Sequence, residues 1–98
     1  MTPESYADLV AEDQRLMLLQ QLQSAADYTA HEHLLRARLA ELGHRLSAAQ
    51  VRAHLGLLDE LGLITLMGDQ IRVARLTLRG DDVASGVARC DGVARPRP

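Results

Sequence analysis

The apolar pattern that follows Ser47 constrains the fold of this chain most, because its period changes at a single point. Val51, Leu55 and Leu58 recur with the spacing of one helical face. Directly after Gly62 the pattern becomes typical of short β-strands, in which alternate residues face opposite sides of a sheet. The chain must therefore fold with a helix that leads at once into a β-hairpin.

Leucine spacing and capping residues predict the remaining elements. The first three predicted helices each follow a polar capping residue: 6–24 after Ser5, 30–42 after Thr29, and 48–61 after Ser47. Two β-type runs, 63–67 and 70–76, flank a turn at Gly68-Asp69 and indicate a hairpin. Thr77 is expected to cap a short last helix that ends near Ala84. About four residues join the second and third helices, which is the helix-turn-helix arrangement.

The predicted fold class is mainly α with a small β-hairpin (α+β), in the order α-α-α-β-β-α. One domain is expected over residues 5–86, followed by a flexible basic tail over 87–98. The predicted first helix is apolar around most of its circumference between residues 16 and 22, so more than one side needs a cover. A second copy of the chain, packed against the Tyr6–Leu22 helix, would supply that cover in a homodimer.

Two stretches resemble winged-helix regulators of the MarR and ArsR type. Residues 47–64, which read SAAQVRAHLGLLDELGLI, are similar to the recognition helix and following strand of those proteins. Residues 76–80, which read LTLRG, resemble their exit from the wing. The whole chain is also similar to small ArsR-like proteins of Mu-like bacteriophages and prophages. The resemblance covers roughly residues 6–86, and it implies a winged helix-turn-helix and a dimeric, sequence-specific DNA-binding transcription regulator.

The same resemblance implies which residues would contact double-stranded DNA. Base readout would fall to Gln50 and Arg52, because glutamine pairs with adenine and arginine with guanine. Backbone and wing contacts would come from a larger set: Arg45, Ser47, Ala49, Ala53, Arg72 and Arg75. An ordinary solvated helix face and plain surface charge explain the same residues, and these alternatives stay open.

Composition excludes several other functions. The chain has two tyrosines, no Phe and no Trp, which argues against binding single strands by base stacking. Its formal charge of −2 excludes a bulk polycation. Four histidines are present, but His31 and His33 would point apart on a helix, so no metal and no cofactor are expected. Cys90 is the single cysteine and lies in the tail, and no catalytic motif is present, so no enzyme activity is expected.

Location and alternative functions complete the expectations. The amino terminus lacks a signal-peptide pattern and no apolar run could cross a bilayer, so the expected location is the cytoplasm, without membrane contact. The main alternative function is a winged-helix module of a phage that binds another protein and not DNA. A third possibility is that the dimer interface senses a small ligand.

Overall fold

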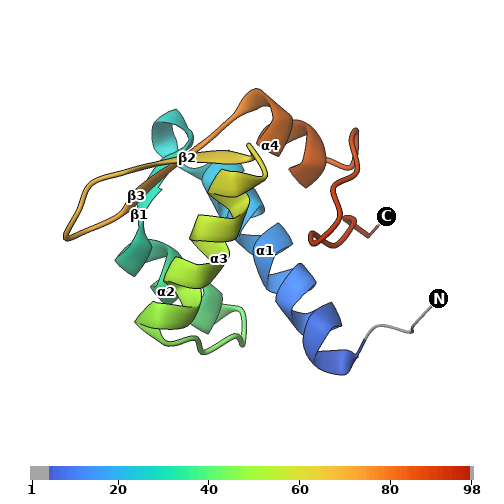
Figure 1. Ribbon diagram of the computed structural model, residues 1–98, viewed down its shortest axis with the longest axis horizontal. Coiled ribbons are helices and arrows are strands. Elements are labelled where there is room, and N and C mark those ends of the chain that lie inside the picture. Colours follow the sequence, from blue (N-terminus) through green and yellow to red (C-terminus); the bar gives the residue numbers. More distant parts are fainter. Residues whose placement is uncertain (1–4, 98) are drawn as a thin grey trace.

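The computed structural model describes residues 5–97 and confirms an α+β domain. Within these residues it contains four α-helices and one antiparallel three-stranded sheet in the order β1-β3-β2 (Figure 1). The elements in chain order are α1 (Tyr6–Ser24), a 3₁₀ turn (Ala26–Tyr28), β1 (Thr29–His31), α2 (Glu32–Glu41), α3 (Ala48–Glu60), β2 (Ile64–Met67), β3 (Val73–Leu76) and α4 (Leu78–Ala84). The hairpin of β2 and β3 extends away from the helices (Figure 1).

Local capping places most helix ends where the sequence predicts them. The hydroxyl groups of Ser5, Ser47 and Thr77 each accept a hydrogen bond from the backbone N–H three residues later, which confirms these three caps. The predicted cap at Thr29 is wrong. His31 caps α2 instead, through its ring Nδ1 and the N–H of Leu34, and Thr29 lies in β1.

Strand β1 is the element that the sequence analysis missed. It has three residues, and they pair with β3 so that Ala30 lies opposite Ala74. Asp27 and Tyr28, just before it, both have positive φ angles, which reverse the chain sharply after α1. Such a short strand carries no alternating pattern of its own, because its existence depends on a partner far along the chain.

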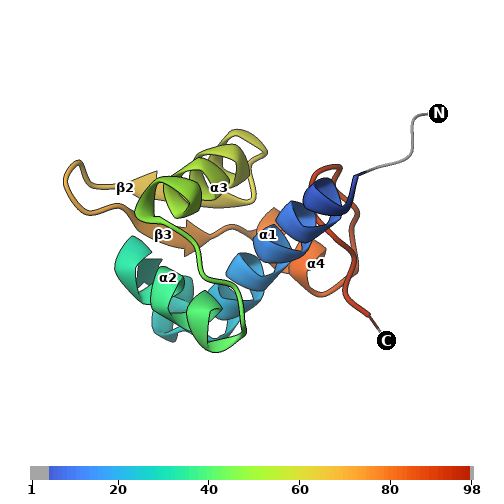
Figure 2. The same ribbon diagram turned by 90° about the horizontal axis from the view of Figure 1, so that it is seen from below.

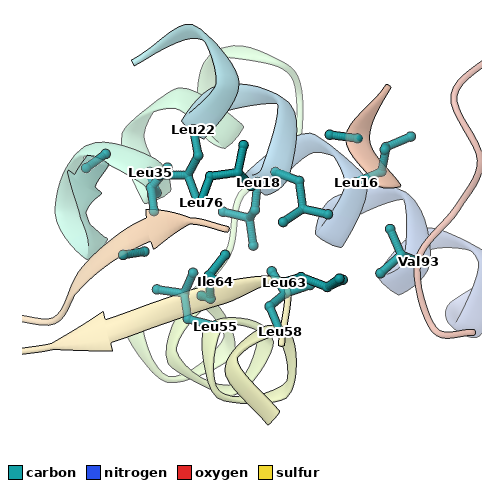
Figure 3. Packing of buried hydrophobic residues seen from close by; sticks show 14 of the residues in the cluster. Leu16, Leu18, Leu22, Leu35, Leu55, Leu58, Leu63, Ile64, Leu76 and Val93 are labelled. Atoms are coloured by element: carbon teal, nitrogen blue, oxygen red, sulfur yellow. The ribbon is translucent and has the colours of Figure 1, made fainter. Parts of the chain in front are cut away.

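The core is aliphatic, as the absence of Phe and Trp requires (Figure 3). Leucines of α1, α2 and α3 pack with the inner face of the sheet, where Ile64, Ala74 and Leu76 are buried. The predicted core stripe of α3 is confirmed: Val51, Leu55 and Leu58 are fully buried. In α2 the spacing of Leu35, Leu39 and Leu42 predicts one buried face, but only Leu35 and Leu39 are buried, because Leu42 lies at the C-cap and is half exposed.

Gly80 explains the close contact between α4 and the end of α3. The N–H of Thr77 donates to the carbonyl of Leu63 at 3.1 Å, and the Thr77 hydroxyl donates to the carbonyl of Gly62 at 2.7 Å. A Cβ atom at Gly80 would overlap with the same Leu63 carbonyl. The first turn of α4 therefore requires glycine for steric reasons, whereas many other helical positions would favour alanine.

The segment after α4 lies against α1, which differs from the flexible tail that the sequence predicts. Val93 is buried in the core cluster, and Figure 3 shows it beside Leu16. The N–H of Ala94 donates to the carbonyl of Glu12 at 3.1 Å, and Arg15 Nη1 donates to the carbonyl of Gly92 at 2.8 Å. One side of α1 that the sequence assigns to a second copy is thus covered by residues of the same chain.

Candidate nucleic-acid interface

The outer face of the first two turns of α3 is uncovered in the described chain. Ala48, Ala49, Gln50, Arg52 and Ala53 are all exposed, and so is the capping residue before them. Figure 2 shows the start of α3, the hairpin tip and the start of α2 on one side of the molecule. The carboxyl-terminal segment and α4 lie on the opposite side (Figure 2). A wide surface is therefore available to a partner along one end of α3.

Gln50 takes part in a capping box at the start of α3. Its Oε1 accepts the N–H of Ser47 at 2.9 Å, while the Ser47 hydroxyl accepts the N–H of Gln50 at 3.1 Å. The predicted base reader therefore has a structural role as well. A contact with adenine would need the Gln50 side chain to exchange this internal bond for one to a base.

Arg52 links three elements and does not extend freely into solvent. Its Nε donates to Oε1 of Glu32 at 2.9 Å, and its Nη2 donates to the carbonyl of Gln70 at 2.8 Å. The second carboxylate oxygen of Glu32 accepts the N–H of Arg72 at 2.7 Å. We call this set of residues, Glu32, Arg52, Gln70 and Arg72, the hairpin clamp. It joins the start of α2, the second turn of α3 and the end of the hairpin loop.

The carboxylate of the hairpin clamp is buried and charged. The Glu32 side chain is 4% exposed, whereas that of Arg52 is 44% exposed. The hydrogen bond from Arg52 lowers the pKa of Glu32 below its ordinary value, against the opposing effect of burial. The backbone N–H of Arg72 and the positive end of α2 favour the charged form in the same direction. Sequence reasoning missed Glu32, because acidic residues are common at the start of a helix and nothing in the sequence distinguishes this one.

The other predicted arginines do not gather into one group. Arg45, in the connection between α2 and α3, and Arg72, in the hairpin, are exposed. Arg75 lies on β3 with its side chain exposed, whereas the neighbouring Ala74 and Leu76 are buried. Arg75 Nη2 is 3.5 Å from Asp27 Oδ1 in the 3₁₀ turn. Arg75 is thus paired with an acid at the end of α1, away from the exposed turns of α3.

Two histidines belong to a second polar network that the sequence analysis did not find. His54 on α3 is buried; its Nε2 lies 3.0 Å from Gln14 Oε1, and its Nδ1 accepts a hydrogen bond from Arg15 Nε at 3.2 Å. The amide nitrogen of Gln14 lies 3.1 Å from Nδ1 of His44. These bonds are consistent with a neutral His54 that carries its proton on Nε2. Burial, and then the nearby Arg15 charge, lower the pKa of His54.

An open groove of ≈ 560 Å³ runs between the amino-terminal half of α1 and the outer face of α3. Its lining includes the apolar side chains of Tyr6, Val10 and Ala53 and the polar network around His54. Tyr6 is 79% exposed. The groove continues from the exposed face of α3, so it offers an apolar surface beside the predicted DNA-contacting residues.

Two further searches of the structure concern metals and membranes. Over residues 5–97, no three His, Cys, Asp or Glu side chains lie close enough to hold a metal ion together. No helix in this part of the chain combines the length and the apolar character that a membrane span needs.

The chain is similar to two proteins, one from a phage and one from a bacterium. It is 40% identical over 94 residues to a protein of Escherichia phage Mu named uncharacterized protein gp26. The aligned residues make up 93% of this chain and 95% of that protein. It is also 40% identical over 77 residues to an uncharacterized protein of Haemophilus influenzae, and these residues make up 76% of this chain and 74% of that protein. No protein-family model matches. The similarity to a small protein of phage Mu is thereby confirmed, and neither name speaks of MarR- or ArsR-type regulation.

Proposed function

The chain belongs to the family of the phage Mu protein gp26, and we propose that this domain is a winged helix that binds double-stranded DNA and regulates transcription. The supporting observation is the exposed start of α3 beside an exposed β-hairpin. A helix with its side chains is about 10–12 Å wide, and the major groove is about 12 Å wide. In this proposal α3 enters the groove and the hairpin lies on the neighbouring backbone.

The proposed contacts differ in how readily the side chains can make them. Arg45 and Arg72 are exposed and can reach phosphate groups directly. Gln50 and Arg52 can read bases once they give up internal hydrogen bonds. Asp59 and Glu60 at the far end of α3 would repel phosphate, so contact is expected in the first half of the helix.

The active form in this proposal is a homodimer. Because the carboxyl-terminal segment covers one side of α1 near Leu16, the contact between copies is proposed at the other end of that helix, where Tyr6 and Leu9 are exposed. Two-fold symmetry then calls for a pseudo-palindromic site with half-sites one helical turn apart, about 34–36 Å.

DNA binding is tested by selecting ligands from a pool of random duplexes, followed by a salt titration of the selected sequence. Several arginine–phosphate contacts release counterions, so the logarithm of the binding constant should fall steeply with the logarithm of salt concentration. The result against the proposal is that no duplex is enriched and no binding is measured at about 50 mM salt.

A matched pair of variants separates base readout by Arg52 from its role in the hairpin clamp. Arg52→Ala removes both the clamp and the side chain that would read guanine. Glu32→Gln weakens the clamp but leaves Arg52 available. If Arg52 reads a base, Arg52→Ala alone should relax sequence preference and cost about 1–3 kcal/mol of specific binding. Equal effects of the two variants would assign Arg52 to the clamp alone.

A second candidate function is a protein-binding module, favoured by the apolar groove between α1 and α3. The groove is lined by Tyr6, Val10 and Ala53, and the chain has a net charge of −2. A protein partner would contact these residues, whereas DNA would contact Arg45 and Arg72. Loss of a purified partner's binding in Ala53→Glu, with no duplex bound by the wild-type chain, would support this function over DNA binding.

A further inference from the structure

A second open hollow lies between the outer side of α2 and the connection that leads into α3. Its volume is ≈ 630 Å³. Ala37, Ala40 and Leu46 contribute its apolar lining. Leu46 directly precedes the capping residue Ser47, so the hollow borders the exposed start of α3. It is therefore placed where a ligand lying along α3 would pass.

Basic side chains dominate the polar part of this hollow. Arg36 and His33 come from α2, and Arg45 comes from the connection. Arg36 Nε donates to the carbonyl of Leu46 at 2.7 Å, which ties the guanidinium group to the chain just before α3. Because the guanidinium carries five N–H donors in a rigid fork, the hydrogen bond to Leu46 leaves other donors for an anion. Arg45 is exposed beside it.

One carboxylate also lines the hollow, and it has a partner of its own. Glu41 Oε2 lies 3.4 Å from Nη1 of Arg38, on the exposed surface of α2. The Arg38 charge offsets that of Glu41, so Arg36 and Arg45 leave the hollow with an excess of positive charge. Such a pair of guanidinium groups matches the chemistry of phosphate, for which arginine provides a bidentate donor pair.

The hollow and the hairpin clamp use neighbouring residues at the start of α2. Glu32, at the start of α2, binds Arg52 and the N–H of Arg72 in the hairpin, and His33 is the next residue of the helix. His33 in turn lines the hollow with Arg36. The hollow therefore begins one residue after Glu32 along α2 and ends at Leu46, directly before the capping residue of α3.

We propose that Arg36 and Arg45 bind a phosphate group of the DNA backbone in this hollow, beside the groove that α3 enters. The inference rests on the proposed function and deepens it. Arg36, which the resemblance did not mark, joins Arg45 as a backbone contact in this proposal. The ligand is a phosphodiester, so this contact adds affinity on every sequence and does not choose among bases.

The test measures the salt dependence of duplex binding for the wild-type chain, Arg36→Ala, Arg45→Ala and the double variant. The double variant should lower the slope of log K against log salt by about 1 for each bound chain, with the same loss on selected and unselected duplexes. Arg36→Lys keeps the charge and should retain the wild-type slope. Arg79→Ala, at an exposed arginine of α4 on the opposite side of the domain (Figure 2), is the matched control and should also retain it.

The possible outcomes separate this inference from the proposed function. If the wild-type chain binds duplexes and the double variant keeps the full slope, the phosphate site is overturned and DNA binding stands. If the wild-type chain binds no duplex, both are overturned. A titration with inorganic phosphate at constant ionic strength checks the source of the anion. Binding of free phosphate that depends on Arg36, together with an unchanged duplex slope, would show a small-anion site and overturn the DNA contact. Urea unfolding confirms that each variant is folded.

Discussion

Removal of Arg52 should destabilise the domain through Glu32, irrespective of any ligand. Arg52→Ala removes one hydrogen-bond donor from a carboxylate that is 4% exposed and leaves it the N–H of Arg72. Removing one member of a fully buried ion pair costs about 3–5 kcal/mol. A hydrogen bond to a charged group contributes about 1.5–3 kcal/mol. Because Arg52 itself is 44% exposed, water can reach its position, and we expect a loss near the lower range, about 2 kcal/mol.

The assay is urea unfolding of four proteins: wild type, Arg52→Ala, Glu32→Gln and the double variant. In thermal unfolding, the same loss of about 2 kcal/mol corresponds to a fall of roughly 8–16 °C in melting temperature for a domain of this size. The double-mutant cycle should give a coupling energy between Glu32 and Arg52 of at least about 1 kcal/mol. A coupling below about 0.5 kcal/mol would refute the reasoning, since the pair would then contribute no more than an exposed ion pair.

The pH dependence gives an independent check on the same clamp. The pKa of Glu32 is lower in the folded state than in the unfolded chain. Its contribution to stability is therefore present above about pH 4.3 and is lost as the pH falls through the lower, folded-state value. Arg52→Ala should reduce this acid sensitivity, because the largest cause of the low pKa is then absent. An acid unfolding profile identical to that of the wild type would contradict the assignment.

Three further predictions follow from other parts of the structure. Gly80→Ala should destabilise the domain by about 1–3 kcal/mol in urea unfolding, because its Cβ would overlap with backbone. At Gly56 in α3 an added Cβ atom would have no neighbour within 4 Å, so Gly56→Ala should stabilise the domain by about 0.5–1 kcal/mol. Similar effects of the two substitutions would be inconsistent with a steric cause at Gly80. Stability should fall as the pH drops below about 6.5, because His54 has a lowered pKa and the unfolded chain takes up its proton first. The urea midpoint of the wild type should therefore be lower at pH 5.5 than at pH 8, and His54→Gln should reduce this difference. If the difference is the same in His54→Gln, the pH dependence belongs to other groups. Leu9→Asp should convert the proposed dimer to a monomer in sedimentation equilibrium; a wild-type protein that sediments as a monomer at all concentrations would remove the dimer from the proposal.

Most of the helical architecture and the hairpin could be predicted from sequence, because the signals are local. The caps at Ser5, Ser47 and Thr77 each join groups three residues apart, so a short window of sequence contains both partners. The same holds for the leucine stripe of α3 and the change of period after Gly62. Thr29 shows the limit of this reasoning: it suits a helix cap by type, yet pairing with Arg75 places it in a strand.

The candidate site was harder to predict, because its geometry depends on contacts between distant residues. Arg52 is exposed in part, as a DNA-contacting residue should be, but its hydrogen bonds to Glu32 and Gln70 follow only from the packing of α2 and the hairpin against α3. Arg36 belongs to the proposed phosphate site because its hydrogen bond to the carbonyl of Leu46 holds it beside the connection to α3. No spacing rule connects these residues, so sequence alone marked the arginines without sorting them by role.

By itself the sequence determined where α1, α3 and α4 begin, that Val51, Leu55 and Leu58 enter the core, and that a hairpin follows α3. Tertiary structure decided which polar groups meet: Glu32 with Arg52 across 20 residues, Gln14 with His54 across 40, and Arg15 with Gly92 across 77. The physical reason is range. Helix caps and apolar periods are complete within one or two turns of chain, whereas buried polar pairs form only after the elements that carry them have packed.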